Sequence, residues 1–503
     1  MDFFNMLSVG LMTAFQPHNI LYCFTGVFIG TMIGVLPGIG PAGTVAILLP
    51  TTFNISPVSA IIMLAGIYYG AMYGGSTTSI LVNIPGESAS VVTCIDGYQM
   101  ARQGRAGPAL GICAFGSFIA GIVGIIILSF LAPPLANFAL RFGPPEYFSL
   151  MVLGLTLVIY LGSGSVLKAL MTAVFGIILG CVGQDPILGR PRLTYGIDHL
   201  WDGVGFIPVI MGLFGVSEIL LNMEKNGEKR EIYDTKIKGL LPNREDWRRS
   251  ALPITRGSLL GFFLGILPGA GATISSLASY AIEKKFSKHP ERFGKGAIEG
   301  VAGPESANNS ATMGAMVPLL TLGIPSNVVM AILLAALMIH GTTPGPLLMV
   351  NHPDLFWGVI VSMFVGNLML LTLNLPLIGI WVRLLKVPYK ILFPLIILFC
   401  LVGAYSFRST VVDIVLVMIF GYLGYLMKKY GYEPAPLVLA FVLGPLMENN
   451  LRQALIISKG GFDIFFVRPI SLGCLVMAFI FLFLPLIPLI KKKRKELLMG
   501  EET

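Results

Sequence analysis

The chain has 503 residues, of which 55% are hydrophobic and only 12% are charged, and its formal net charge is +8. A soluble globular protein carries about 25% charged residues, so this composition excludes that class. The basic residues gather at the ends of apolar stretches, where they orient a membrane protein, and the net charge therefore does not indicate nucleic-acid binding.

Apolar stretches of roughly 20 residues, the length that crosses a hydrocarbon core of about 30 Å as a helix, recur along the whole chain. The clearest are 112–132, 147–161, 204–221, 391–404, 410–427 and 470–490. They are continuous rather than alternating, which excludes a β-barrel. We predict an all-α polytopic membrane protein with roughly 10–14 transmembrane helices. Residues 1–16 are short for a crossing, and whether they span is left open.

The first unusual motif is "GTMIGVLPGIGP" (30–41), which places Pro37 and Gly38 in the middle of an apolar stretch. Proline removes a backbone donor, and glycine permits a tight reversal. Broken backbone at membrane depth is tolerated only where it is buried in protein or lines a wet cavity. We predict a broken helical hairpin, whose restarted helix presents free N–H groups and a positive dipole end.

A second motif, "YYGAMYGGSTTSILVNIPGESASVVTCIDGY" (68–98), brings polar groups into an otherwise apolar stretch. A single Ser or Thr in a membrane helix usually bonds its own helix or a neighbouring one. The cluster around Pro85 and Gly86 instead favours ligand binding, because hydroxyls and amides can donate to carboxylates or accept from cations. Its polar residues are Ser76, Thr77, Thr78, Ser79, Asn83, Glu87, Ser88 and Ser90.

Both motifs have counterparts in the second half of the chain. "GFFLGILPGAGA" (261–272) repeats the first and "GAMVPLLTLGIPSNV" (314–328) the second, while Gly345-Pro346 repeats Gly107-Pro108. The three matches keep their order at offsets of 231, 240 and 238 positions, which indicates an internal duplication. The spacing of Gly26, Gly30 and Gly34, which match Gly257, Gly261 and Gly265, indicates close helix packing rather than ligand contact.

Basic residues give the two copies opposite directions. The second Leu-Pro-Gly stretch lies between 223–252, with eight Lys or Arg, and 284–295, with five, and both segments should be cytoplasmic. The first stretch has no Lys or Arg before Arg102. We therefore expect two inverted repeats, whose re-entrant hairpins enter from opposite faces and meet near the bilayer midplane. The positive helix ends at these tips favour anionic groups.

The second copy also carries a carboxylate and two amides, in "EGVAGPESANNSATMGAMVPLLTLGIPSN" (299–327). Glu305, Asn308 and Asn309 share one helix face, and such groups are costly in an apolar bundle unless they are paired. We expect the two amides to bind ligand, whereas Glu305 fits cation binding and a helix-capping role equally well. Without Lys or Arg near the Pro-Gly centres, co-transported cations would offset the charge of a carboxylate substrate.

The motifs do not indicate catalysis, nucleotide binding or a resident cofactor. The sequence has no G-x-x-x-x-G-K-[ST] loop, its five histidines are scattered near predicted loops, and its six cysteines stand singly in apolar surroundings. We therefore expect no enzyme activity and no cofactor, apart from a co-transported Na⁺ or H⁺. Asp96, Glu283 and Asp413 lie beside predicted loops, where we expect the membrane interface.

The segments "GVLPGIGP", "YYGAMYGGSTTSILVNIPGESASVVTCIDGYQMARQGRAGPALG" and "EGVAGPESANNSATMGAMVPLLTLGIPSN" closely resemble the TctA family, the large membrane subunit of tripartite tricarboxylate transporters. The resemblance spans essentially the whole chain. It implies a bacterial inner-membrane permease driven by a Na⁺ or H⁺ gradient, with a small TctB-like membrane subunit and a periplasmic TctC-like solute-binding protein as partners. Citrate-like carboxylates are the founding substrates, and members of the family vary.

The expected mechanism is alternating access of the elevator type, which the resemblance makes plausible. The alternative is a gated anion channel that uses the same re-entrant hairpins; the asymmetric polar cluster and the resemblance argue against it. We expect four segments: a first repeat half (1–222), a charged cytoplasmic linker (223–252), a second, inverted half (253–460), and an extra helix with a basic cytoplasmic tail (461–503).

The candidate site residues lie at and around the four breaks. The substrate is expected to contact Pro37, Gly38, Gly40, Thr44, Ser76, Thr77, Asn83, Pro85, Gly86, Ser88, Pro268, Gly269, Gly271, Thr273, Ser275, Asn308, Asn309, Pro325, Ser326 and Asn327. The co-transported cation is expected at Gly38, Gly269, Glu305, Asn309 and Thr321.

Overall fold

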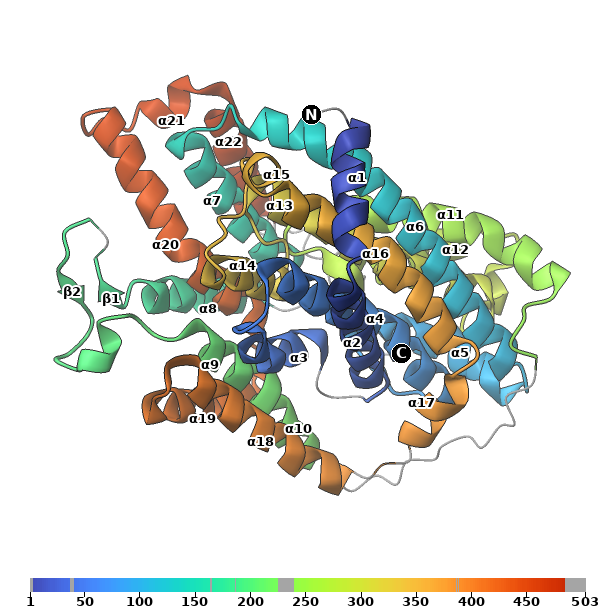
Figure 1. Ribbon diagram of the computed structural model, residues 1–503. Coiled ribbons are helices and arrows are strands. Elements are labelled where there is room, and N and C mark those ends of the chain that lie inside the picture. The colour runs from blue at the N-terminus through green and yellow to red at the C-terminus, as the bar shows by residue number, and fades with distance from the viewer. Residues whose placement is uncertain are drawn as a thin grey trace.

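The computed structural model describes residues 3–36, 40–162, 165–185, 187–224, 239–385, 387 and 389–484. These residues form helices almost throughout (Figure 1), and their only β-structure is the short antiparallel pair β1 (Gly183–Gln184) and β2 (Pro191–Arg192). The predicted all-α class is therefore confirmed. Pro37, Gly38, most of the charged linker (225–238) and the basic tail (485–503) lie outside the described residues.

Many of the helices are long and apolar enough to cross a membrane. Seven described helical segments are long and apolar enough to span: α2 (Pro17–Val35), α4 (Pro57–Val82), α6 (Ala106–Ala139), α7 (Pro144–Leu161), Phe206–Glu224, α16 (Pro353–Asn374) and α19 (Val411–Lys429). Shorter helices with apolar stretches are α1 (Phe3–Ala14), α8 (Val166–Gly180), α14 (Val328–Ile339), α18 (Tyr389–Arg408) and α22 (Pro469–Phe483). The Phe206–Glu224 segment is α9 (Phe206–Ile210), a π-helical turn (Met211–Val216) and α10 (Ser217–Glu224).

The remaining elements are shorter or more polar. They include the helices α3 (Gly40–Leu48), α5 (Val91–Arg102), α11 (Arg244–Ile266), α12 (Gly271–Phe286), α13 (Glu299–Leu322), α15 (Leu348–Asn351), α17 (Ile378–Leu384), α20 (Pro434–Ile457) and α21 (Ile464–Val467). Four 3-10 turns cover Leu49–Thr52, Ser88–Ser90, Asp198–Leu200 and Pro290–Arg292.

A helix begins inside the charged segment between the two halves. The helix α11 starts at Arg244, inside the segment that we expected to be linker up to residue 252. Its start is fixed by Asn243, whose side chain accepts the N–H of Asp246 at 2.8 Å while Asp246 accepts the N–H of Asn243 at 3.2 Å. This reciprocal capping satisfies two free backbone donors.

A central bundle is built from pairs of closely packed helices. The first Leu-Pro-Gly helix, α2, lies along α4, and its counterpart α11 lies along α13. A Cβ added to Gly26, Gly30 or Gly34 would collide with the backbone of Met63, Ile67 and Ala71; the matched Gly257, Gly261 and Gly265 face Gly303, Ala307 and Ala311. Glycine stripes let helix backbones approach this closely, so the packing interpretation of these glycines is confirmed.

The same contacts support the duplication read from the sequence. Residues 26, 30 and 34 precede their counterparts by 231 positions, and their partners on α4 precede those on α13 by 240. The α2–α4 contacts of the first half therefore recur as the α11–α13 contacts of the second half, although the two helices of each pair are displaced along the chain by different offsets.

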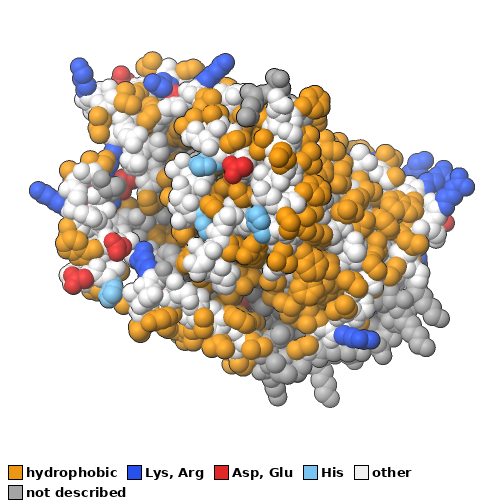
Figure 2. Space-filling view, in the orientation of Figure 1, with side chains coloured by type: hydrophobic (Ala, Val, Ile, Leu, Met, Phe, Trp, Pro, Cys, Tyr) orange, Lys and Arg blue, Asp and Glu red, His pale blue; other side chains and the backbone are white. Residues whose placement is uncertain are grey.

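Further helix groups flank this bundle. In Figure 1, α7, α20 and α22 lie together at the upper left with α8 below them, and α9, α10, α18 and α19 lie together at the lower left. Figure 2 shows a broad apolar surface on the facing side of the molecule, with a cluster of Lys and Arg at its right edge and further Lys and Arg scattered along the top and left. Lys284, Lys285 and Lys288 are exposed near the end of α12. An apolar belt flanked by basic residues is typical of a membrane protein.

Candidate functional site

The two Leu-Pro-Gly breaks are built alike where both are described. In the first half, α2 ends at Val35 and α3 begins at Gly40, which has φ +66°. In the second half, α11 ends at Ile266 and α12 begins at Gly271, which has φ +55°. Such left-handed backbone favours glycine. The predicted interruption of both helices is therefore confirmed, although Pro37 and Gly38 themselves lie outside the described residues.

Both restarted helices carry a hydroxyl in their first turn. Thr44 Oγ1 donates to the carbonyl of Gly40 at 2.9 Å, and Ser275 Oγ donates to the carbonyl of Gly271 at 2.7 Å. Each pair is separated by 231 positions from its counterpart, as the motifs are. These hydroxyls use their protons within their own helices, which leaves their lone pairs as acceptors.

The second pair of breaks also repeats. The helix α4 ends at Val82 and is followed by Asn83 (φ 56°), and α13 ends at Leu322 and is followed by Gly323 (φ 70°). A proline stands two residues after Asn83 and after Gly323. Two residues after each proline, a side chain caps a new helical turn. Glu87 accepts the N–H of Ala89 at 2.6 Å, and its counterpart Asn327 accepts the N–H of Met330 at 3.0 Å.

The four breaks lie against one another. A Cβ on Gly86 would collide with the carbonyl of Gly34, just before the first Leu-Pro-Gly, and the N–H of Gly269 in the second donates to Ser326 O at 3.0 Å. Contacts also cross between the halves: Ser88 and Thr273 share a hydrogen bond of 3.0 Å, and α3 packs against α14. The structure therefore brings the sequence-predicted motifs together.

The matched helices α4 and α13 run in opposite directions where they meet. Ser76 bonds Glu305, whereas Tyr68, two turns earlier on α4, accepts a hydrogen bond from Asn327, which follows the end of α13. Residues further along α4 therefore contact residues that come earlier in the second half. This is the arrangement that inverted repeats would have.

Glu305 is the buried centre of a polar network between the halves. Its side chain is fully buried on α13 and accepts hydrogen bonds from Ser76 Oγ at 2.6 Å, from the Thr93 hydroxyl and from Asn308 Nδ2 at 3.2 Å. The capping interpretation of Glu305 is wrong, because α13 begins six residues earlier at Glu299. Its acceptors are saturated by hydroxyls and an amide, as a buried carboxylate requires.

Asn309 extends this network toward α6. Its amide nitrogen donates to Ser117 Oγ at 2.7 Å, to Asn308 Oδ1 at 2.6 Å and to the carbonyl of Glu305 at 3.0 Å. Its Oδ1 is buried with no hydrogen-bond partner among the described residues. A small pocket reaches the outer edge of the network and is lined by Tyr73, Ser76, Thr77, Leu110, Cys113, Ala114, Ser117, Asn374 and Ile378.

Of the five residues expected to hold a cation, Gly38 lies outside the described residues, and the other four do not lie together. Glu305 and Asn309 are adjacent, but Thr321 lies about 18 Å further along α13 and donates within its own helix to Val317 O at 2.7 Å. Gly269 faces α7, where a Cβ would come within 2.6 Å of the Cα of Val158. Their roles in binding stay predictions, and the geometry favours the Glu305–Asn309 pair.

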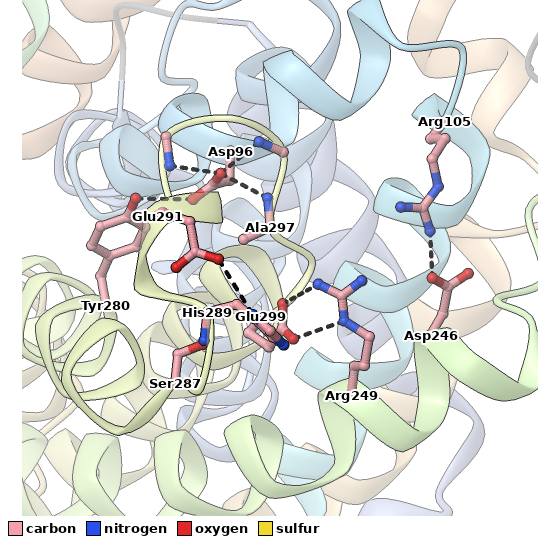
Figure 3. A network of polar contacts seen from close by, with 12 residues as sticks. Asp96, Arg105, Asp246, Arg249, Tyr280, Ser287, His289, Glu291, Ala297 and Glu299 are labelled. Carbon is pink, nitrogen blue, oxygen red and sulfur yellow. Dashed lines mark hydrogen bonds and ion pairs between the residues drawn. The ribbon is translucent and has the colours of Figure 1, made fainter.

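Sequence reasoning missed a polar anchor at the end of the molecule where the basic residues gather (Figure 3). Asp96 is fully buried, and its Oδ1 accepts the N–H groups of Gly294, Gly296 and Ala297 at 2.8–2.9 Å while Tyr280 donates to Oδ2 at 2.9 Å. Its backbone donors lie about 200 positions away in the chain. The anchor fastens α5 of the first half to the α12–α13 connection of the second.

Ion pairs around this anchor bind the same helices together. Arg249 on α11 makes two hydrogen bonds of 2.8 Å to Glu299 at the start of α13, and Arg105 before α6 pairs with Asp246 (Figure 3). Both carboxylates stand in the first turn of a helix, where negative charge is favoured. Ion pairs thus stabilise this end of the bundle, whereas neutral hydrogen bonds such as Ser88–Thr273 connect the segments at the hairpin tips.

Comparisons with known proteins identify the family of this chain. The model of the family described as "Tripartite tricarboxylate transporter TctA family" matches residues 20–439. The "Uncharacterized 52.8 kDa protein in TAR-I ttuC' 3'region" of Agrobacterium vitis is 52% identical over 502 residues, covering 100% of both chains.

The "Uncharacterized protein in TAR-II ttuC' 3'region" of the same organism is 49% identical over 242 residues, which is 48% of this chain and 100% of that one. No solved structure matches. The family match covers most of the chain, including all four breaks and the Glu305 network. The chain is therefore a multi-pass membrane transport protein that belongs to the tripartite tricarboxylate transporter TctA family.

Proposed function

We propose that this protein is the permease of a secondary active transporter that imports a di- or tricarboxylate across the bacterial inner membrane. The observation that carries the proposal is the convergence of four matched helix breaks from the two halves of the chain. A small TctB-like membrane subunit and a periplasmic TctC-like binding protein would be its partners. The family membership supports these partners and the multi-pass topology. The basic segment "KKKRK" (491–495) would place the C-terminus in the cytoplasm.

The chemistry of the breaks suits an anionic substrate. The helices α3 and α12 restart next to the breaks, and their first N–H groups and positive dipole ends favour carboxylate groups. Hydroxyls and amides, among them Ser88, Thr273 and Asn327, supply further donors. The charge of the substrate would be offset by a Na⁺ or H⁺ that moves with it.

Counterflow tests this proposal against the gated channel. Proteoliposomes loaded with an unlabelled carboxylate, such as citrate, malate or succinate, should transiently accumulate the same labelled compound, because exchange requires a carrier. Asn309→Ala should weaken the apparent affinity by about tenfold to a hundredfold, since a hydrogen bond to a charged group is worth roughly 1.5–3 kcal/mol. A matched control is Asn450→Ala, whose side chain bonds Leu446 O within α20. Flux without trans-stimulation would instead identify a channel.

An elevator mechanism would require the hairpin tips to slide past a static helix, and α7 is in position for this. A Cβ on Gly154 of α7 would lie 3.9 Å from Cβ of Pro268 in the second tip, close to the mean spacing of a disulfide, about 3.8 Å. In a Gly154→Cys/Pro268→Cys variant, oxidation should stop counterflow and reduction should restore it. Unchanged counterflow in the fully oxidised protein would exclude sliding at this contact, and the reduced protein controls for the substitutions themselves.

A further inference from the structure

Another buried carboxylate lies at the first-half break and belongs to none of the networks described above. Glu87 is 5% exposed and stands directly after Pro85-Gly86. Its Oε2 accepts the N–H of Ala89 at 2.6 Å, and its Oε1 is buried with no hydrogen-bond partner among the described residues. The side chain packs against α4, where a Cβ on Gly75 would lie 2.9 Å from Cγ of Glu87.

Among the described residues, the titratable groups that face Glu87 provide no positive charge. They are Glu305 on α13, Tyr68 on α4 and Cys94 on α5, each near enough for an electrostatic interaction. An ionised carboxylate buried without a cationic partner costs several kcal/mol, whereas an unpaired neutral hydroxyl costs about 1–3 kcal/mol. Burial beside a second carboxylate therefore favours the protonated form of Glu87.

The matched position in the second half shows that capping does not require a carboxylate. Asn327 stands 240 positions after Glu87 and caps α14 by accepting the N–H of Met330, with an amide that bears no charge. The two halves share their helix breaks, caps and glycine stripes, but they differ in charge at this position, where the first half has Glu87 and the second has Asn327. Only the first-half residue can gain and lose a proton.

Glu87 is also placed where a proton and an anionic substrate would affect each other. The residue before it, Gly86, touches the end of α2 next to the first tip, and the residue after it, Ser88, bonds Thr273 on the helix that follows the second tip. The described residues contain no group of three or more His, Cys, Asp or Glu side chains placed to hold a metal ion.

We propose that Glu87 binds the proton that drives transport, so that one carboxylate charge of the substrate is compensated by protonation at the first-half break. This inference rests on the proposed transport function and adds the coupling ion and its residue. Substrate binding near a protonated Glu87 then stabilises the proton, and proton binding strengthens substrate binding by the same factor.

The first test is spectroscopic and needs no substrate. In reconstituted protein at neutral pH, the infrared spectrum should contain the C=O stretch of a buried protonated carboxyl group, and this band should disappear on raising the pH. Glu87→Gln should abolish the band and Glu305→Gln should retain it. The control is Glu146→Gln, a buried helix-capping carboxylate that accepts the N–H of Gly143 at 2.9 Å but is paired with Arg468. A band that is absent from the wild type, or that persists in Glu87→Gln, overturns the proposal.

The second test measures coupling. An inward proton gradient should drive accumulation of the counterflow substrate by wild type and by Glu146→Gln, and on the order of tenfold less by Glu87→Gln. Counterflow by Glu87→Gln should also lose its dependence on pH. Accumulation by Glu87→Gln at the wild-type level, or wild-type uptake driven by a sodium gradient alone at equal pH, overturns the proton assignment and leaves the transport function standing. If the wild type shows no counterflow of any carboxylate tested, the proposed function fails, and the infrared band still decides whether Glu87 binds a proton.

Discussion

Gly269→Ala should reduce uptake per folded transporter by more than tenfold and should also lower thermal stability. Gly269 has φ +85°, where a Cβ is strained by roughly 1 kcal/mol or more. The same Cβ would lie 2.6 Å from the Cα of Val158 on α7, and overpacking of this kind costs about 1–3 kcal/mol in addition. The tip would have to move away from α7, which would shift the start of α12 and its contact with Ser88.

Gly271→Ala separates the two effects. Gly271 has φ +55°, but a Cβ added there meets no atom within 4 Å, so this variant carries only the backbone strain. Both proteins should be compared by melting temperature and by counterflow normalised to folded protein. Equal losses in the two variants would show that the approach of the tip to α7 is unimportant, and a wild-type rate in Gly269→Ala would remove the second tip from the mechanism.

Asp96→Ala should cause the largest loss of stability among the polar residues. The substitution leaves three backbone N–H groups and the Tyr280 hydroxyl without their acceptor in a buried region. Unsatisfied buried donors cost about 1–3 kcal/mol each and do not add fully, so a loss of about 3 kcal/mol or more is expected. The affected connection leads directly into α13, and the Glu305 network should therefore be disturbed as well.

Thermal unfolding in detergent, followed by the loss of monodisperse protein, measures this effect. Asp198→Ala, which removes an exposed aspartate in a 3-10 turn, is the matched control and should leave the melting temperature nearly unchanged. Asp96→Asn retains one acceptor oxygen and should lie between the two. A melting temperature of Asp96→Ala equal to that of Asp198→Ala would contradict the anchoring role.

The positions of the helix breaks could be predicted from the sequence because proline and glycine act locally. Pro268-Gly269 interrupts its helix where the motif indicated, and the sequence offsets of 231 and 240 recur in the contacts of the folded protein. Helical spacing alone also predicted that Glu305, Asn308 and Asn309 share one face. In the structure, Asn308 donates to the carboxylate of Glu305 and Asn309 donates to its backbone carbonyl.

The partners of these residues could not be predicted, because they come from distant segments. Ser76 lies 229 positions before Glu305, and the donors to Asp96 lie 198–201 positions after it. Nothing in the local sequence around Asp96 distinguishes a buried anchor from a residue at the membrane interface. The unpaired oxygen of Glu87 likewise emerges only when α4 and the turn after Gly86 are packed together.

The most direct measurement of the central claim is a density map of the protein with the carboxylate that gives the strongest counterflow. The account predicts that the carboxylate lies between the restarted helices α3 and α12, within hydrogen-bonding distance of their first N–H groups and of the Ser88–Thr273 contact. A carboxylate bound elsewhere, for example in the pocket lined by Asp198, Asp202, Arg408 and Asp413, with the four breaks packed only against protein, would contradict the claim.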